Sequence, residues 1–205
     1  IAAAPEPAAP ATPTQPGEAG GNAAPVTEVA GIFDLPRWRR GGEATFVDDE
    51  KALSAAILDA PERDKPQARM ALAQFHFAHG RYAEALGDLQ LLDKLAADGD
   101  KDVLTLRGAT QALMDREADA AQDLARDEVK DVPEAALFNG YLAAKEGDWK
   151  KGAEIFGGLI PSLDDYPKSA RMLIRRAAAE ALIRGDNPLS AQAFLDSMRL
   201  LIETN

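Results

Sequence analysis

Residues 68–93 read ARMALAQFHFAHGRYAEALGDLQLLD, and this stretch decides the fold. Two apolar patterns with helical spacing flank a turn at His79-Gly80. A small residue stands in each pattern, Ala73 in the first and Ala85 twelve positions later. Because small side chains let two helices approach closely, we expect an antiparallel helical hairpin that crosses at these two alanines.

The same arrangement recurs along the chain, with small residues always twelve positions apart. The pairs are Ala73 and Ala85, Gly108 and Ala120, Gly140 and Gly152, and Ala178 and Ser190. Four residues after each pair comes a large apolar residue: Leu89, Leu124, Phe156 and Phe194. The expected turns are at Gly80, Asp115, Gly147 and Gly185. Since one hairpin cannot bury its apolar face alone, four in series predict a stacked array with a continuous core.

This pattern resembles the tetratricopeptide (TPR) family, whose repeat is a helix–turn–helix unit of about 34 residues. The resemblance covers residues 65–202. It implies an all-α fold, a right-handed α-α superhelix of about four helical hairpins preceded by an N-terminal helix. The sequence departs from the family where Arg107 and Glu117 occupy positions that are usually apolar. The aromatic residue expected near the start of each first helix is also missing. These departures leave a looser TPR-like stack as the alternative.

In TPR proteins the first helices line a concave groove that binds a partner. Carried over position by position, the groove consists of Met70, Gln74, Phe77, Thr105, Ala109, Leu113, Leu137, Tyr141, Lys145, Arg175 and Leu182. This mixed lining fits an apolar peptide or helix better than a charged chain end. The alternative is that these side chains pack against the chain's own N-terminal segment.

The chain before the repeats divides into two parts. Residues 1–30 are rich in alanine and proline and contain no Lys or Arg, which predicts a disordered linker. Residues 31–46 concentrate apolar and arginine side chains. They predict either a cap packed on the array or a docking segment for a partner, with Phe33, Leu35 and Trp38 as the anchors. The repeat domain then spans residues 47–205.

A separate helix is expected over residues 51–60, ahead of the first hairpin. Asp48 and Asp49 suit its start, because negative charge is favourable near a helix N-terminus, and Pro61 ends it. Leu53, Ala56, Ile57 and Ala60 share one face of this helix. We expect that face to cover the exposed side of the first hairpin.

Composition excludes several classes of function. The net charge of −11 argues against nucleic acid and against an anionic membrane surface as partners. The absence of cysteine excludes disulfides and thiol chemistry. No apolar run is long enough to cross a membrane, so we expect no membrane insertion within this chain.

Candidate catalytic and metal sites are weak, and we expect a non-enzymatic protein with no cofactor and no metal. His76 and His79 could share a helix face, but no third ligand is compellingly placed. Residues 98–102 resemble the start of a calcium loop, but the required later glycine and glutamate are missing. Asp100 or Asp102 is instead expected to cap the next helix.

The last predicted helix is apolar on more than one side, through Phe194, Leu195, Met198, Leu201 and Ile202. Arrays usually finish with a polar capping helix, so we expect the natural protein to continue or this helix to mediate a homo-oligomer.

Taken together, the repeats and the groove positions predict a scaffold or adaptor that binds a peptide or helix of a partner protein. The alternatives are a structural segment of a longer solenoid and a non-catalytic regulatory domain of an enzyme. The linker favours a bacterial periplasmic or membrane-anchored location, with a cytoplasmic one as the alternative.

Overall fold

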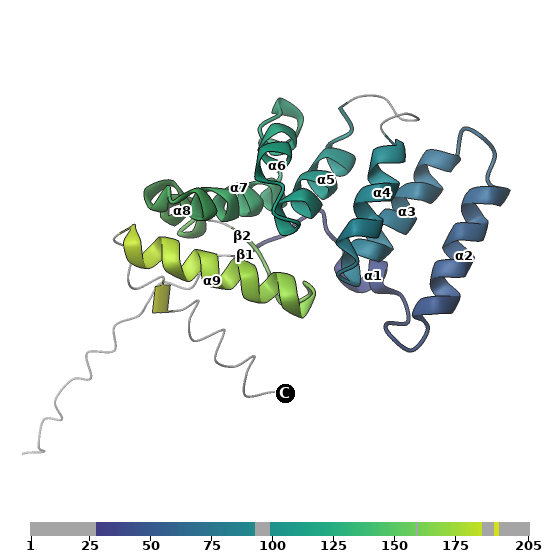
Figure 1. Cartoon of the computed structure of the whole chain (residues 1–205), viewed down its shortest axis with the longest axis horizontal. Helices are drawn as coiled ribbons and strands as arrows, with labels where there is room; N and C mark the ends of the chain where they lie inside the picture. Colours follow the sequence, from purple (N-terminus) through teal and green to yellow (C-terminus); the bar gives the residue numbers. More distant parts are fainter. Residues whose placement is uncertain (1–27, 93–98, 159, 186–190, 193–205) are drawn as a thin grey trace, which may run out of the picture.

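The computed structural model describes residues 28–92, 99–158, 160–185 and 191–192. The fold is all-helical apart from one pair of two-residue strands (Figure 1). The elements in order are β1 Glu28–Val29, α1 Leu35–Arg39, α2 Phe46–Asp59, α3 Lys65–Ala78, α4 Tyr82–Leu92, α5 Lys101–Leu113, α6 Glu117–Leu124, the 3₁₀ turn η1 Asp127–Val129, α7 Pro133–Glu146, α8 Trp149–Phe156, β2 Ile160–Pro161 and α9 Lys168–Arg184.

The predicted helical hairpins are present as three packed consecutive pairs, α3 with α4, α5 with α6, and α7 with α8. Close approach at the small residues is confirmed. A Cβ atom added to Gly108 would lie 2.6 Å from Cγ of Leu124, and one added to Gly140 would lie 2.9 Å from Cγ2 of Ile155. Helix α9 packs on α7 and α8 and carries Ala178, the first residue of the fourth pair. Its expected partner at Ser190 lies outside the described residues.

The turns within the three hairpins share one hydrogen-bond pattern. The amides of Arg81, Arg116 and Asp148 donate to carbonyls five residues earlier, at 2.8, 3.0 and 2.9 Å. The preceding residues, Gly80, Asp115 and Gly147, have φ of 72°, 58° and 83°. This combination is the Schellman helix ending, in which a left-handed residue follows the helix. The turns at the predicted positions are therefore equivalent in conformation. Gly185, with φ of −91°, ends α9 differently.

The helix expected at residues 51–60 differs from the observed one at its start. Helix α2 begins five residues earlier, at Phe46, because the Phe46 ring stacks on Phe75 at 5.1 Å and extends the contact with α3. Leu53 and Ile57 are buried as predicted, whereas Ala56 is exposed. Asp100 caps α5 as expected, because its Oδ1 accepts hydrogen bonds from the amides of Asp102 and Val103.

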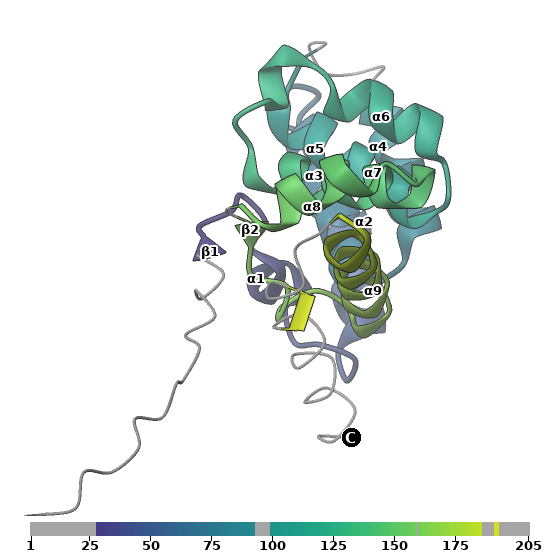
Figure 2. The same cartoon turned by 90° about the vertical axis from the view of Figure 1, so that its left-hand side faces the viewer.

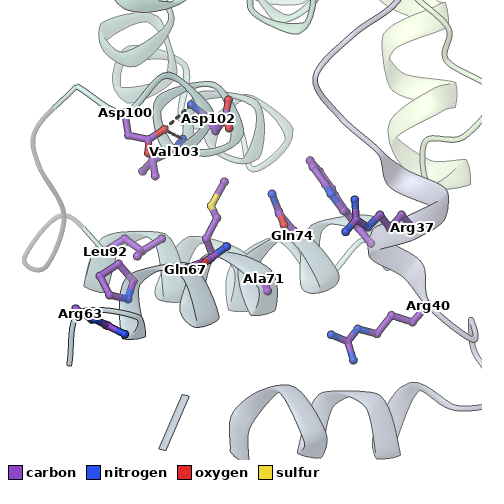
Figure 3. Close-up of a pocket in the computed structure, with 13 residues that line it drawn as sticks. Arg37, Arg40, Arg63, Gln67, Ala71, Gln74, Leu92, Asp100, Asp102 and Val103 are labelled. Atoms are coloured by element: carbon purple, nitrogen blue, oxygen red, sulfur yellow. Dashed lines mark hydrogen bonds between the residues drawn. The ribbon is translucent and has the colours of Figure 1, made fainter. Parts of the chain in front are cut away.

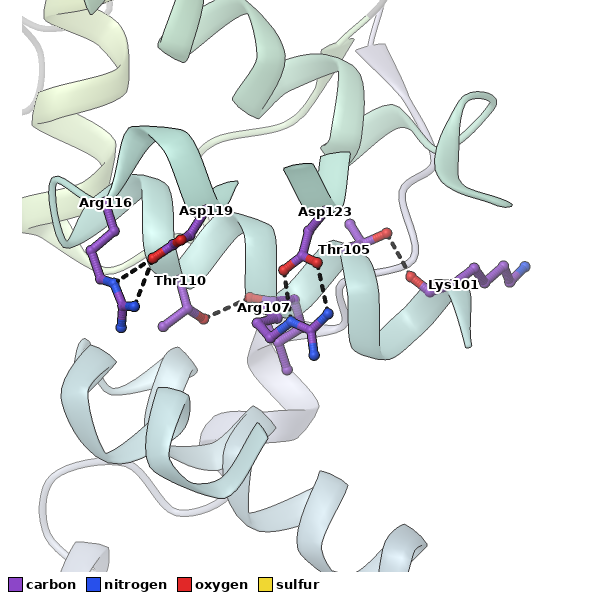
Figure 4. A network of polar contacts seen from close by, with 8 residues as sticks. Lys101, Thr105, Arg107, Thr110, Arg116, Asp119 and Asp123 are labelled. Atoms are coloured by element: carbon purple, nitrogen blue, oxygen red, sulfur yellow. Dashed lines mark hydrogen bonds and ion pairs between the residues drawn. The ribbon is translucent and has the colours of Figure 1, made fainter. Parts of the chain in front are cut away.

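An ion pair accounts for Arg107, which was unexpected at a position that is usually apolar. Its Nε and Nη2 both donate to the Asp123 carboxylate of α6, each at 2.6 Å (Figure 4). The equivalent carboxylate of the preceding hairpin, Asp88, lies 3.4 Å from the guanidinium of Arg69. In both hairpins, an arginine of the first helix thus pairs with an aspartate three residues after the small residue of the second. Ion pairs thereby replace part of the apolar contact within these two hairpins.

The N-terminal strand changes the predicted domain boundary. Residues 28–29 were assigned to the linker, but β1 pairs in parallel with β2, with Glu28 opposite Ile160 and Val29 opposite Pro161. Figure 2 shows this strand pair at the left-hand side of the helices, and β2 packs against α7. The folded unit therefore includes residues from β1 onwards. The rest of the predicted linker lies outside the described residues.

Two further expectations concern membrane-spanning helices and the last predicted helix, and the structure addresses them only for the residues that it describes. None of its helices is both long enough and apolar enough to span a membrane. The apolar residues of the last predicted helix, from Phe194 to Ile202, lie outside the described residues.

Candidate functional site: a cavity between α1, α3 and α5

The segment expected to cap or dock, residues 31–46, packs against the hairpins. Leu35 is 1% exposed and belongs to the main core. The ring centroid of Phe33 lies 5.4 Å from that of Phe77 in α3 and 5.1 Å from that of Trp38. The Phe33 amide donates to Oε1 of Glu134 in α7 at 2.8 Å, which ties the segment to a residue 101 positions away. These contacts make the segment part of the folded unit.

Arg39 holds the same segment from the other side of α1. Its Nε donates to the Ala78 carbonyl at the end of α3, at 3.3 Å. Its Nη2 donates to the Asp165 carbonyl in the connection before α9, at 2.5 Å. The guanidinium of Arg39 is thus hydrogen-bonded within the fold. The side chains of Arg37 and Arg40 do not share these two contacts.

Most of the predicted groove positions are buried in the fold. The buried ones are Phe77, Thr105, Ala109, Leu113, Leu137, Tyr141, Arg175 and Leu182. The Phe77 ring is covered by Phe33 and lies 6.4 Å from the ring of Tyr166. Arg175 donates to the Asp164 carboxylate at 2.7 Å. An open groove along all these positions is therefore not present, because the chain's own residues occupy the space over Phe77 and Arg175.

Two predicted groove residues, Met70 and Gln74, line an open cavity of about 730 Å³. Trp38, an anchor of the predicted docking segment, lines the same cavity. Helix α3 contributes the central wall, through Pro66, Gln67, Met70, Ala71 and Gln74 (Figure 3). The other contributors are Arg37, Trp38 and Arg40 of α1 and its C-terminus, Arg63 before α3, Leu92 of α4, and Asp100, Asp102 and Val103 at the start of α5. We call this space the α1–α3–α5 cavity.

Charge is divided between the walls of the α1–α3–α5 cavity. Figure 3 shows Arg37 and Arg40 on one side and Asp100 and Asp102 on another. Arg40 lies 4.0 Å from Asp49, and Arg63 lies 3.4 Å from its neighbour Asp64, with both arginine side chains well exposed. Exposed pairs of this kind are weak and leave donors for another partner. In the ranges that the structure describes, no carboxylate pairs with the Arg37 guanidinium.

His76 joins three helices beside this site. Its Nδ1 lies 3.0 Å from Oδ2 of Asp88 in α4, and its Nε2 lies 3.0 Å from Oε1 of Glu50 in α2. Burial lowers the pKa of His76, but hydrogen bonds and charge from the two carboxylates outweigh burial and raise the pKa above 6.5. Because both ring nitrogens are engaged, the imidazole has no free nitrogen with which to act on a bound molecule.

His79 has a related role at the end of α3. Its Nε2 lies 3.1 Å from the Arg39 carbonyl, and its ring packs on Phe46 and Phe75. The two histidines therefore attach residues 39–50 to α3. Across the described ranges, no group of three His, Asp or Glu side chains is arranged to hold a metal ion.

Tyr141 and Lys145, also predicted groove residues, line a smaller cavity of about 300 Å³ next to α9. Burial raises the pKa of Tyr141. Hydrogen bonds to Asp115 and then to Glu117 raise the pKa of Lys145, so this ammonium is charged and paired. The pairing connects α7 to the turn between α5 and α6. It gives Lys145 a role within the fold that the groove assignment did not include.

Sequence reasoning missed several residues of the α1–α3–α5 cavity. Gln67 lies one helical turn before Met70 on the same face, so the periodicity of α3 could have identified it. Arg40 and Arg63 lie in connections, and only the packing of α1 and α2 around α3 brings them to the cavity. No local sequence signal places such residues in a shared site.

Comparison with known proteins found no match: no family model, no curated protein and no solved structure matches this chain.

Proposed function

We propose that this chain is a protein-interaction module, a TPR-like helical-repeat array that binds a peptide or helix of a partner protein in the α1–α3–α5 cavity. One observation carries the proposal. Met70 and Gln74, derived from the groove positions of the repeat, and Trp38, derived from the docking segment, line the same open cavity. A cavity of about 730 Å³ with aromatic, thioether and amide side chains has the size and mixed character of a ligand site.

The repeat architecture supports the TPR-like part of the proposal. Equivalent Schellman turns at Gly80, Asp115 and Gly147 give each hairpin the same reversal. The close approaches at Gly108 and Gly140 recur at one position of the repeat. Similar hairpins stacked in series produce a superhelix, and we propose that it is right-handed, as in the family that the sequence resembles. The Ala/Pro-rich composition of residues 1–30 is typical of linkers in cell-envelope proteins, so we propose a cell-envelope assembly as the setting.

Site-specific photocrosslinking tests this function. A benzoylphenylalanine is placed in the full chain at Gln74, at Gln67, or at the control position Leu58, and the protein is irradiated in an extract of its own cells. Gln74 and Gln67 line the cavity, whereas Leu58 is 81% exposed on α2. We expect both cavity positions to yield the same discrete adduct, which mass spectrometry identifies as one segment of one protein. Adducts of equal yield and identity at Leu58, or no adduct at the cavity positions, would contradict the proposal.

The control position also tests the second function, self-assembly as a segment of a longer solenoid. Helix α2 stands at one end of the array and exposes Val47 and Leu58. A crosslink from Leu58 to another copy of the same chain would support end-to-end assembly. Single exposed apolar residues are common on protein surfaces, which makes this the weaker candidate.

A further inference from the structure

The residues that line the α1–α3–α5 cavity indicate the chemical class of the ligand that it binds. We infer that it selects an acidic peptide segment, one in which carboxylate side chains flank a large apolar side chain. This inference rests on the proposed function, because it names the class of peptide that the same cavity binds.

The basic side of the cavity is available to a ligand. Arg37 of α1, Arg40 at its C-terminus and Arg63 in the connection before α3 line the same opening. Figure 3 shows Arg37 and Arg40 on one side and Arg63 on the opposite side. Arg39, which lies between two of them in the sequence, is instead bonded to the carbonyls of Ala78 and Asp165. The fold therefore separates the arginine that holds α1 in place from those that face the cavity. A guanidinium that pairs bidentately with a carboxylate makes one of the strongest polar contacts that proteins use.

The local charge contrasts with that of the whole chain. The chain has 34 acidic and 23 basic residues, so the presence of three arginines in the lining of this cavity is not the result of general basicity. Long-range repulsion from the acidic molecule falls off beyond about 8–10 Å at physiological salt. Beyond that distance the net negative charge repels an acidic ligand only weakly, whereas at contact the arginines pair with its carboxylates. This favours short-range recognition of specific carboxylates over non-specific attraction.

The rest of the lining sets the ligand's orientation. Trp38, Met70 and Val103 offer apolar surface for one large side chain. At the α5 side, Asp100 uses Oδ1 to cap the helix, and Asp102 is exposed in the first turn. These two aspartates disfavour an anion at their end of the cavity. The carboxylates of the ligand are thus directed towards Arg37 and Arg40 at the α1 side, which fixes the direction in which the ligand binds.

Selection from random peptides tests the inference without knowledge of the natural partner. Short random peptides displayed on phage are selected against the full chain, against the double variant Arg37→Gln/Arg40→Gln and against the control Arg184→Gln. Arg184 is an exposed arginine in α9 that pairs with Glu180. We expect peptides enriched in Asp and Glu beside Leu, Phe or Trp. Their affinity should fall roughly tenfold or more in the double variant and stay unchanged in the control.

A blocking variant separates failure of this inference from failure of the proposed function. Gln67→Trp adds bulk at an exposed residue of the cavity wall, so it should block the site without disturbing the core. Peptides that lose binding to Gln67→Trp but show no Asp or Glu enrichment would overturn the inference and leave the proposed function intact. Peptides whose binding is indifferent to Gln67→Trp would contradict both.

Oligouridylate serves as the competing probe, because phosphates also pair with arginine and bases stack on tryptophan. Binding of this RNA that exceeds peptide binding and depends on Arg37 and Arg40 would overturn the inference in favour of a nucleic-acid site. We expect no measurable binding, since Asp100 and Asp102 oppose a continuous polyanion across the cavity. Equal circular dichroism spectra for all variants establish that the substitutions act at the site and not on the fold.

Discussion

Small residues at helix crossings determine how closely the hairpins pack. Gly108 faces Leu124, and an added Cβ would lie 2.6 Å from the leucine Cγ, closer than real Cβ contacts. In α4, Gly87 has no atom within 4 Å of its added Cβ. The two glycines therefore provide a matched pair, one required by packing and one carrying only the entropic disadvantage of glycine.

We expect Gly108→Ala to lower the free energy of unfolding by about 1–3 kcal/mol, because α5 and α6 must separate or Leu124 must leave its rotamer. Gly87→Ala should raise the free energy of unfolding by about 0.4–1 kcal/mol, because alanine favours the helix. Urea denaturation followed by circular dichroism measures both. An unchanged free energy of unfolding in Gly108→Ala would show that α5 and α6 pack less closely than in the structure.

Asp115 carries the left-handed conformation that glycine carries in the other two hairpin turns. Its φ is 58°, compared with 72° and 83° at Gly80 and Gly147. Asp115 also pairs with Lys145, an exposed interaction of small value. Asp115→Gly should therefore stabilise the chain by up to about 1 kcal/mol, whereas Gly147→Ala should destabilise it by about 1–2 kcal/mol. Thermal unfolding curves that shift in the same direction for both variants would contradict the equivalence of the turns.

At the scale of elements, His76 fastens α2 and α4 to α3 through Glu50 and Asp88. Arg69 also faces this group, at 3.4 Å from Asp88, and partly offsets the negative charge around the ring. The raised pKa means that the folded protein binds the His76 proton more tightly than the unfolded chain does. This contribution to stability is fully present below the ordinary pKa of 6.5 and is lost as the pH rises through the folded value.

We expect the stability difference between the native chain and His76→Gln to be larger near about pH 5 than near about pH 8. The difference at low pH should be about 1–3 kcal/mol, typical of hydrogen bonds to charged groups. Chemical denaturation at a series of pH values measures it. Asp88→Asn is the control, because it keeps the shape but removes one charge and should flatten the pH dependence. If the free energies of unfolding of the native chain and His76→Gln depend on pH in parallel, the proposed role of His76 in holding α2 and α4 to α3 is contradicted.

Helix pairing was predictable from the sequence, because its signals are local. Small residues twelve positions apart, the large residue that follows and a turn residue such as Gly80 lie within one hairpin. The Phe33–Glu134 bond and the β1–β2 pair span more than a hundred residues and leave no periodic trace. The sequence therefore predicted the positions of the hairpins. It offered packing of residues 31–46 over the groove positions as one alternative, but it could not decide between that packing and a free docking segment.

At the scale of the whole molecule, residues 28–46 behave as part of the domain. Leu35 is 1% exposed within the main core, whereas Val47, just after the segment, is 56% exposed. We expect Leu35→Ala to lower the free energy of unfolding by about 2–5 kcal/mol and Val47→Ala to change it by less than about 0.5 kcal/mol. Urea denaturation and hydrogen exchange at the Phe33 amide together report global and local opening. A small effect of Leu35→Ala would support a detachable docking segment.

The burial of most groove positions also explains why the candidate site is restricted to one end of the array. Phe33 and Tyr166 cover Phe77, while Met70 and Gln74 of the same helix remain open to the cavity. The sequence placed the groove along this helix face, but it could not show which part of the face the chain leaves free. That division depends on where α1 ends, and the tertiary contacts of Arg39 and His79 determine its position.

The most direct test of the central claim, that the α1–α3–α5 cavity binds a partner peptide, uses Trp38 as a reporter. The chain has two tryptophans, so Trp149→Phe leaves Trp38 as its single tryptophan fluorophore. The variant is titrated with the partner segment identified by crosslinking at Gln74, and binding is measured in parallel by calorimetry. We predict a saturable shift of Trp38 emission that gives the same affinity as calorimetry. Calorimetry should detect no binding of the segment to the blocking variant Gln67→Trp. Calorimetric binding with no change at Trp38 would show that the partner binds elsewhere and would contradict the claim.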